Sequence, residues 1–575
     1  MSDTLTETAS GSAAGALADL AADHWQAYLA SHPYEATVIG ERRFDALLED
    51  ESPEGTEARL GSIAGFRARA VSIDPEALSE ADRLTRSVLI EALDAEAARL
   101  KSGLHEWTVD PVQGPHILFM GLPPLQPVST VAEGQDFIGR VGAMADFLDV
   151  HMANLRRSLA RGTVAVHEPV VKTIGTLDGM ATTPLESWAI LDPIHEAHDD
   201  WAAADVEDFR ADLLAVVRER LSPAFGRYRD MLVEEILPAA RSDDQPGIMH
   251  VAGGAEAYRL LIKAHTSLDR SAQETHDIGL SEVERIKTET VALGTRLFGT
   301  TDYASTIERM QTDATLYYTT RDEILADARR AMDKARAAIP AWFGRLPEAD
   351  CVVMPIPEHE EAHSVLGYYW QPAADGSRPG QYYLNTRLPE RRPRYESEAL
   401  AYHESIPGHH LQIAIAQELT GLPEFRRHMG VTAFDEGWGL YTERLADEMG
   451  LYSSDLDRLG ILAFDAWRAC RLVLDTGIHA LGWTRQQAID YMRDNSPVMI
   501  ENIINEVDRY ISWPGQALAY KTGQLEILRL RAWAEAELAE RFDIRAFHDA
   551  VLLQGAVPLP TLDDQVARFV ARARA

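Results

Sequence analysis

Cysteine is almost absent from this chain of 575 residues, and the two present, Cys351 and Cys470, provide no disulfide framework. Scarcity of cysteine pairs is typical of proteins in a reducing compartment, so we expect a cytoplasmic location. The sequence has no run of about 18 apolar residues, which argues against a membrane-spanning helix. It also lacks a basic N-terminal segment followed by an apolar run, so we expect no secretory signal.

Basic residues are scarce relative to acidic ones. The chain has 55 Lys and Arg against 90 Asp and Glu, for a formal charge of −35. A strongly acidic surface repels phosphate groups, which argues against nucleic acid and anionic membranes as partners. With 46% hydrophobic residues the chain is globular, and its charge favours a peptide or a small molecule as substrate. The sequence leaves open whether it is a monomer or a homodimer.

Strand signals are also few. Most of the chain shows the three- and four-residue spacing of helices, so we predict a mainly α fold. The exceptions are three apolar or aromatic runs, with a loop at 372–380 between the last two. They predict a small antiparallel sheet just before residue 403. The three runs are residues 351–356, 366–370 and 381–385.

Chain length is compatible with one large helical enzyme or with two fused lobes. The polar residues 1–15 are predicted to be a disordered tail. The best linker candidate, residues 242–247, divides the rest into an N-terminal helical region, 16–245, and a C-terminal catalytic region, 246–575. The two regions could also form one structural unit.

The most informative segment is residues 403–410, His-Glu-Ser-Ile-Pro-Gly-His-His. It looks like an altered HExxH zinc motif, in which two histidines four residues apart face one side of a helix. Here the fourth position is Pro407, and the next histidine is His409. On a straight helix six residues rise about 9 Å and rotate about 240°, which would separate the two imidazoles. Either the helix breaks at residues 407–408 and forms a modified site, or the cluster is a chance one.

A zinc hydrolase needs a third ligand and a carboxylate that takes a proton from the metal-bound water. Glu404 is the candidate base. Glu436 is the candidate third ligand, in the segment Glu-Gly-Trp-Gly-Leu-Tyr-Thr-Glu. Glu443, seven residues later on the same helix face, could support an imidazole from behind.

A third segment, Pro-Gly-Gln-Ala-Leu-Ala-Tyr-Lys at residues 514–521, follows an arginine. Tyr520 is a candidate for stabilising an oxyanion. Arg509 and Lys521 are candidates for substrate binding, with surface salt bridges as the alternative.

Together these three motifs resemble a widespread bacterial family classed as a domain of unknown function. That family is similar to the gluzincin zinc metallopeptidases, such as carboxypeptidase Taq, thimet oligopeptidase and angiotensin-converting enzyme. The resemblance spans about residues 381–531; the N-terminal half matches only as a helical sequence. It implies a large helical fold with a deep cleft walled by the N-terminal helices and a small sheet beside the active-site helix.

The resemblance also assigns roles to single residues. It makes His403, His409 and Glu436 the ligands of one Zn²⁺ per chain, with His410 facing the substrate. His410 stays the alternative second ligand. It further makes Glu404 the base, Tyr520 the oxyanion donor, and the strand near Tyr383 an edge strand that pairs with an extended peptide.

We therefore predict a zinc-dependent hydrolase that cleaves amide bonds of short peptides or peptide-like small molecules. One alternative is a metal-dependent tailoring enzyme, a lyase or an amidohydrolase, acting on a non-peptide substrate. A second is a non-catalytic helical binding protein whose altered motif has lost the metal. A third is a metal with a purely structural role. Zinc itself is inferred from the His/His/Glu ligand set.

Overall fold

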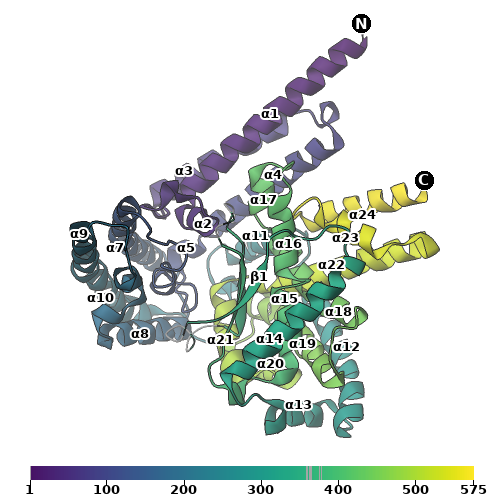
Figure 1. The fold of residues 1–575 in the computed structure, drawn as a ribbon. Helices are drawn as coiled ribbons and strands as arrows, with labels where there is room; N and C mark the ends of the chain where they lie inside the picture. The colour runs from purple at the N-terminus through teal and green to yellow at the C-terminus, as the bar shows by residue number, and fades with distance from the viewer. Residues whose placement is uncertain (1, 358–360, 362–364, 374–375, 377) are drawn as a thin grey trace.

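The structure is a computed structural model, and it describes residues 2–357, 361, 365–373, 376 and 378–575. Its first helices are α1 (Ser2–Ser31), α2 (Pro33–Val38), α3 (Pro53–Ser72) and α4 (Glu80–Ser102). The N-terminal end of α1 projects away from the rest of the molecule (Figure 1). The residues of the predicted tail belong to this helix, and their disorder in solution stays a prediction.

A second group of helices forms a separate lobe, dark blue in Figure 1. Its buried apolar side chains, from Val109 to Ile236, pack into a core of their own. This core ends shortly before the boundary that we predicted at residue 245. The helices are α5 (Leu104–Trp107), α6 (Pro115–Leu118), α7 (Val131–Ala160), α8 (His167–Thr182), α9 (Ala203–Val216) and α10 (Ser222–Met231).

The remaining helices form the main body, and the buried side chains of α1, α3 and α4 belong to its core. Helices α1, α3 and α4 therefore pack with the C-terminal region, whereas the segment between α1 and α3 also contacts the second lobe, where Arg140 of α7 donates to the carbonyl oxygens of Phe44 and Leu47. Before the sheet come α11 (Gly254–Thr266), α12 (Ala272–Phe298), α13 (Tyr303–Thr312) and α14 (Arg321–Ala338). After it come α15 (Ser397–Glu404), α16 (His409–Glu418), α17 (Glu424–His428), α18 (Thr432–Glu448), α19 (Asp455–Ala480), α20 (Arg485–Asn495), α21 (Ile500–Ser512), α22 (Ala519–Leu538), α23 (Ile544–Leu552) and α24 (Leu559–Arg574).

Local sequence signals explain where several of these helices begin. Thr484 accepts a hydrogen bond from the backbone of Gln487, whose side chain reaches back to the backbone of Thr484. This is a capping box, and it satisfies two amide groups that the first helical turn leaves free. The same arrangement opens α7, α12 and α14.

Within the described residues the sheet has three strands, β1 (Cys351–Pro355), β2 (Gly367–Trp370) and β3 (Gly380–Leu384). Strand β3 lies in the middle, antiparallel to β2 and parallel to β1. The predicted sheet was therefore right for one pair and wrong for the other. Apolar runs show that strands exist, but strand order depends on contacts that no local pattern encodes. The sheet packs against α14 and α15, and so lies beside the helix that carries His403.

Helix α19 lies at the centre of the main body, against α12, α15 and α22. Every residue from Leu459 to His479 is buried. A helix buried on all sides is normally apolar, but α19 carries Asp465, Arg468 and Arg471 inside this stretch. No helix of the described residues is long and apolar enough to cross a bilayer.

Candidate metal centre

A break between α15 and α16 brings the two histidines of the altered motif together. Helix α15 ends at Glu404 and α16 begins at His409. The imidazole rings of His403 and His409 are 4.7 Å apart between centroids and nearly perpendicular. The break that we predicted at residues 407–408 is thus present, and it removes the separation that a straight helix would impose.

Gly408 is required for this break because of space. A Cβ atom at this position would lie 1.9 Å from the carbonyl oxygen of His403 and 2.4 Å from that of Tyr402. The indole Nε1 of Trp438, on α18, donates a hydrogen bond of 3.0 Å to the carbonyl oxygen of Pro407. The connecting segment is therefore held against the helix that carries the third candidate ligand.

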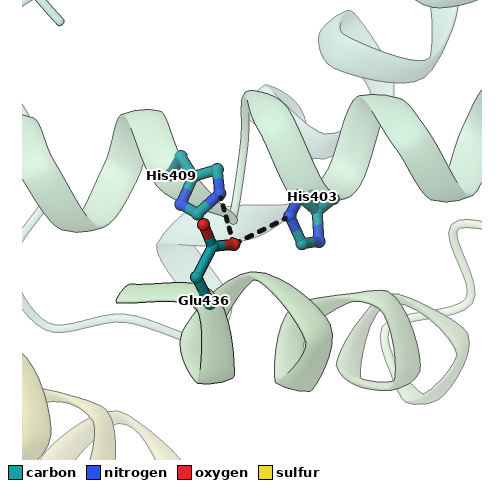
Figure 2. Close-up of side chains that lie close together, drawn as sticks. All are labelled: His403, His409 and Glu436. Carbon is teal, nitrogen blue, oxygen red and sulfur yellow. Dashed lines mark ion pairs between the residues drawn. The ribbon is translucent and has the colours of Figure 1, made fainter. Parts of the chain in front are cut away.

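Glu436 lies between the two imidazoles, as Figure 2 shows. Its Oε2 atom is 3.8 Å from Nε2 of His403 and 3.6 Å from Nε2 of His409. One ligand atom from each of the three residues lies within 4.8 Å of the others. Ligand atoms about 2.1 Å from a tetrahedral zinc ion are about 3.4 Å apart. The three side chains therefore fit a zinc site after only a small contraction.

The His403 ring is held from the other side. Its Nδ1 is 2.9 Å from Oε1 of Glu443, which leaves Nε2 directed at Glu436. Gly439 makes room for the ring, because a Cβ there would lie 2.7 Å from it. Burial alone would lower the pKa of His403, but hydrogen bonds to Glu436 and Glu443 outweigh it and raise the pKa to about 10. The same imidazoles hold the pKa of Glu436 well below its ordinary value, although burial raises it.

We expect Glu443→Gln to weaken zinc binding by about 10- to 100-fold, the usual effect of losing a carboxylate behind a ligating histidine. A glutamine can still hydrogen-bond the ring but no longer supports it with a negative charge. Competition titration with a chromogenic chelator measures the change. The control is Glu501→Gln, an exposed carboxylate on α21. Equal zinc affinity of the Glu443 variant and the control would contradict this role.

Glu404, the candidate base, is buried at the end of α15. Burial raises its pKa, as does the charge of Glu436, while His403, His409 and Arg468 act in the opposite direction. Glu404 is the last residue of α15 and directly follows the candidate ligand His403. A glutamate whose pKa is raised toward neutrality is a better proton acceptor and donor for catalysis.

His410 is corrected as the alternative second ligand, because it lies outside the group formed by His403, His409 and Glu436. It is 1% exposed, and its two ring nitrogens lie 2.9 Å from the hydroxyl of Tyr369 and 3.0 Å from the carbonyl oxygen of Ala349. Burial lowers its pKa to about 4. The ring is therefore committed to contacts with the sheet region, and it does not ligate in this arrangement. Its role toward a substrate stays a prediction. One residue along a helix rotates a side chain by about 100°, which separates His410 from His409.

Lys521 is also corrected, because it is fully buried and neutralised. Its ammonium group lies 2.5 Å from Asp465 and 2.9 Å from Glu282, and it donates to Gln524 at 2.7 Å. This network joins α12, α19 and α22 and leaves no donor for a substrate. Arg509 differs, since it retains some exposure and contacts Gln516.

Tyr520 lies near Arg509 and not among the ligands. Its hydroxyl accepts hydrogen bonds from Arg509 at 3.3 Å and from Gln516 at 3.4 Å. Its role at an oxyanion stays a prediction. Tyr383 does not lie on an edge strand, because β3 is the central strand and its backbone already pairs on both sides. Its ring stacks on Tyr368 of β2.

Three polar residues near the centre, Asp435, Tyr382 and Arg468, were missed from the sequence. Asp435 has a buried Oδ1, and His409 a buried Nδ1, without a hydrogen-bond partner among the described residues. Asp435 precedes Glu436 and could have been noticed as its neighbour. The buried hydroxyl of Tyr382 likewise has no partner, and the Glu404 charge acts on it. Arg468 could have been found as a charge at helical spacing inside an apolar stretch.

The fold and this site define a mainly helical protein with a His–His–Glu group across a broken helix and a buried glutamate beside it. The chain belongs to the family described as bacterial protein of unknown function (DUF885), which matches residues 33–566. This agrees with the family resemblance of the motifs. The relation to gluzincins remains a proposal. No curated protein matches the chain.

Two solved structures share the fold. One, titled "The crystal structure of the putative lipoprotein from Colwellia psychrerythraea", is 27% identical, with a TM-score of 0.90 over 97% of this chain and 99% of that one. The other, "a putative lipoprotein of unknown function from Shewanella oneidensis", is 18% identical, with a TM-score of 0.73 over 96% of this chain and 99% of that one. These titles describe those proteins. The cytoplasmic location expected here stays a prediction.

Proposed function

We propose that this protein is a zinc-dependent hydrolase that cleaves amide bonds of short peptides or peptide-like small molecules. The observation that carries the proposal is the convergence of His403, His409 and Glu436 beside the buried Glu404. Two imidazoles and one carboxylate are a ligand set of catalytic zinc sites, which keep one position open. Bound zinc would activate a water molecule and polarise the amide carbonyl.

The protein's own residues would perform the remaining steps. Glu404 accepts a proton from the attacking water and then donates a proton to the nitrogen of the leaving group. Glu443 keeps the His403 ring in place through its Nδ1. Burial favours small substrates over folded proteins, because the side chains of His403, His409 and Glu436 are only 3%, 12% and 21% exposed.

The first test is the metal content of the untagged protein, with His403→Ala as the variant. We expect about one zinc per chain in the wild type and almost none in the variant, because two remaining ligands hold zinc poorly. Elemental analysis after incubation with zinc measures this. The control is His250→Ala, which removes an exposed histidine.

The outcomes separate the rival functions. Zinc together with cleavage of a peptide library supports the proposal. Zinc without peptide cleavage favours a metal enzyme acting on a non-peptide substrate. A wild type that takes up no zinc contradicts a metal enzyme and favours a binding protein.

A further inference from the structure

Arg468 on α19 is a buried cation with unused donors. It is 5% exposed, and its Nε and Nη1 have no hydrogen-bond partner among the described residues. Its guanidinium lies over the rings of Phe464 and Trp467, at 4.6 and 4.3 Å from their centroids. Buried donors are almost always paired, since leaving them unpaired is costly. A buried arginine with two unpaired donors is therefore a candidate for binding an anion.

Two further arginines lie close by. Arg471 donates to Glu506 at 2.8 Å and to the hydroxyl of Tyr510 at 2.9 Å, while its own Nη1 is buried without a partner. Arg509 shares the same Glu506, at 3.5 Å. Arg468, Arg471 and Arg509 are here called the arginine cluster. Among the described residues, Glu506 is the one carboxylate that pairs directly with any of the three.

The arginine cluster lies beside the candidate metal centre. Helix α19 packs against α15, which carries His403 and Glu404. The Arg471 guanidinium stands 4.2 Å from the centre of the Tyr520 ring, and Arg509 donates to the Tyr520 hydroxyl. Burial lowers the pKa of Arg468 while the charge of Glu443 raises it, and burial raises the pKa of Glu404 while the charge of Arg468 lowers it. Glu443 is already held by His403.

We infer that the arginine cluster binds a carboxylate of the substrate, with Arg468 as its main anchor. This inference rests on the proposed function and narrows its substrates to amides that carry a free carboxylate near the bond to be cleaved. Two N–H groups of one guanidinium match the two oxygens of a carboxylate. A monoanion is also admitted more readily than a phosphate dianion by a chain with a net charge of −35.

The test is a binding comparison that needs no metal and no turnover. Full-length protein stripped of metal with a chelator is titrated calorimetrically with acetyl-trialanine and, separately, with its C-terminal amide. We expect the acid to bind at least about tenfold more tightly, the usual gain from one charge-assisted pair. Arg468→Met should abolish this preference while keeping the apolar contact with Phe464 and Trp467.

The controls separate anchoring from folding. Arg218→Met removes an exposed arginine and should leave the preference intact. Arg468→Lys keeps the charge but loses the paired donors, so an intermediate preference is expected. Circular dichroism and melting temperature report whether each variant folds. If Arg468→Met does not fold, the preference for the acid is compared between Arg468→Lys and the wild type instead.

Equal binding of acid and amide by the wild type, binding of neither, or a preference that Arg468→Met leaves unchanged would overturn the inference. Because the measurement is made without metal, it is independent of the proposed function. A protein that prefers the acid but takes up no zinc would keep the carboxylate site and lose the hydrolase. A hydrolase that binds zinc but shows no preference for the acid would keep the proposed function and lose the carboxylate site.

Discussion

Replacing Glu404 by glutamine is expected to lower kcat by about a thousandfold, within the range for loss of a general base. Glutamine has nearly the same shape but cannot accept a proton from water or return one to the leaving nitrogen. Zinc content should stay at one per chain, because Glu404 is not among the three converging ligands. The variant therefore separates catalysis from metal binding.

The measurement is the rate of cleavage of the best peptide from a library, with zinc determined on the same samples. Glu390→Gln, at an exposed carboxylate outside the group of candidate ligands, should retain full activity. Wild-type activity in Glu404→Gln would exclude Glu404 as the base. Loss of zinc in the variant would instead make Glu404 a ligand and contradict the assignment of Glu436.

The pH dependence of kcat/KM provides a second measurement of the role of Glu404 as the base. Glu404 must be ionised to accept a proton, so activity falls as pH decreases through its pKa. Burial raises that pKa above the ordinary value of 4.5. We therefore expect the acidic limb of kcat/KM above pH 4.5, and an acidic limb below that value would contradict a buried base.

Replacing Gly523 by alanine is expected to destabilise the protein by about 3 kcal/mol, at the upper end of typical overpacking costs. A Cβ at Gly523 would lie 1.8 Å from the carbonyl oxygen of Ala433 and 2.7 Å from Cα of Gly437. Both atoms are backbone of α18 and cannot rotate away. Helix α18 must therefore shift relative to α22, and it carries both Glu436 and Glu443, so zinc affinity should fall as well.

Denaturant unfolding and zinc titration measure the two effects of Gly523→Ala. The matched control is Gly226→Ala on α10, where nothing lies within 4 Å of the added Cβ. Alanine there should stabilise the helix by about 0.5–1 kcal/mol. Equal stability of Gly523→Ala and the wild type would mean that α18 and α22 are less tightly packed than the structure shows.

Much of the fold follows from local rules. Helical spacing, capping residues such as Thr484 and the scarcity of strand signals predict a mainly α protein, and the structure confirms it. The broken helix at residues 407–408 was also predictable, because proline removes a backbone donor and glycine permits a close approach. These features depend on residues a few positions apart.

The long-range contacts did not follow from the sequence. From the sequence alone, Lys521 is expected to be an exposed helix residue. The structure places Asp465, 56 residues earlier, against its ammonium group. Arg468 is a charge inside an apolar helical stretch, and only the burial of α19 on all sides shows that its guanidinium is buried as well. The position of β3 between β1 and β2, which removes Tyr383 from an edge, likewise depends on pairing between separate segments.

The sequence by itself determined the helical class, the family and the residue types of the candidate ligands, because those depend on composition, short-range spacing and motif order. Only the tertiary structure chose His409 over His410 and brought Glu436 within 3.6 Å of it. It also placed Glu443 behind His403 and left two buried donors of Arg468 without a partner among the described residues. The physical reason is that these contacts are set by how α15, α16, α18 and α19 pack, and packing combines segments that no local pattern relates.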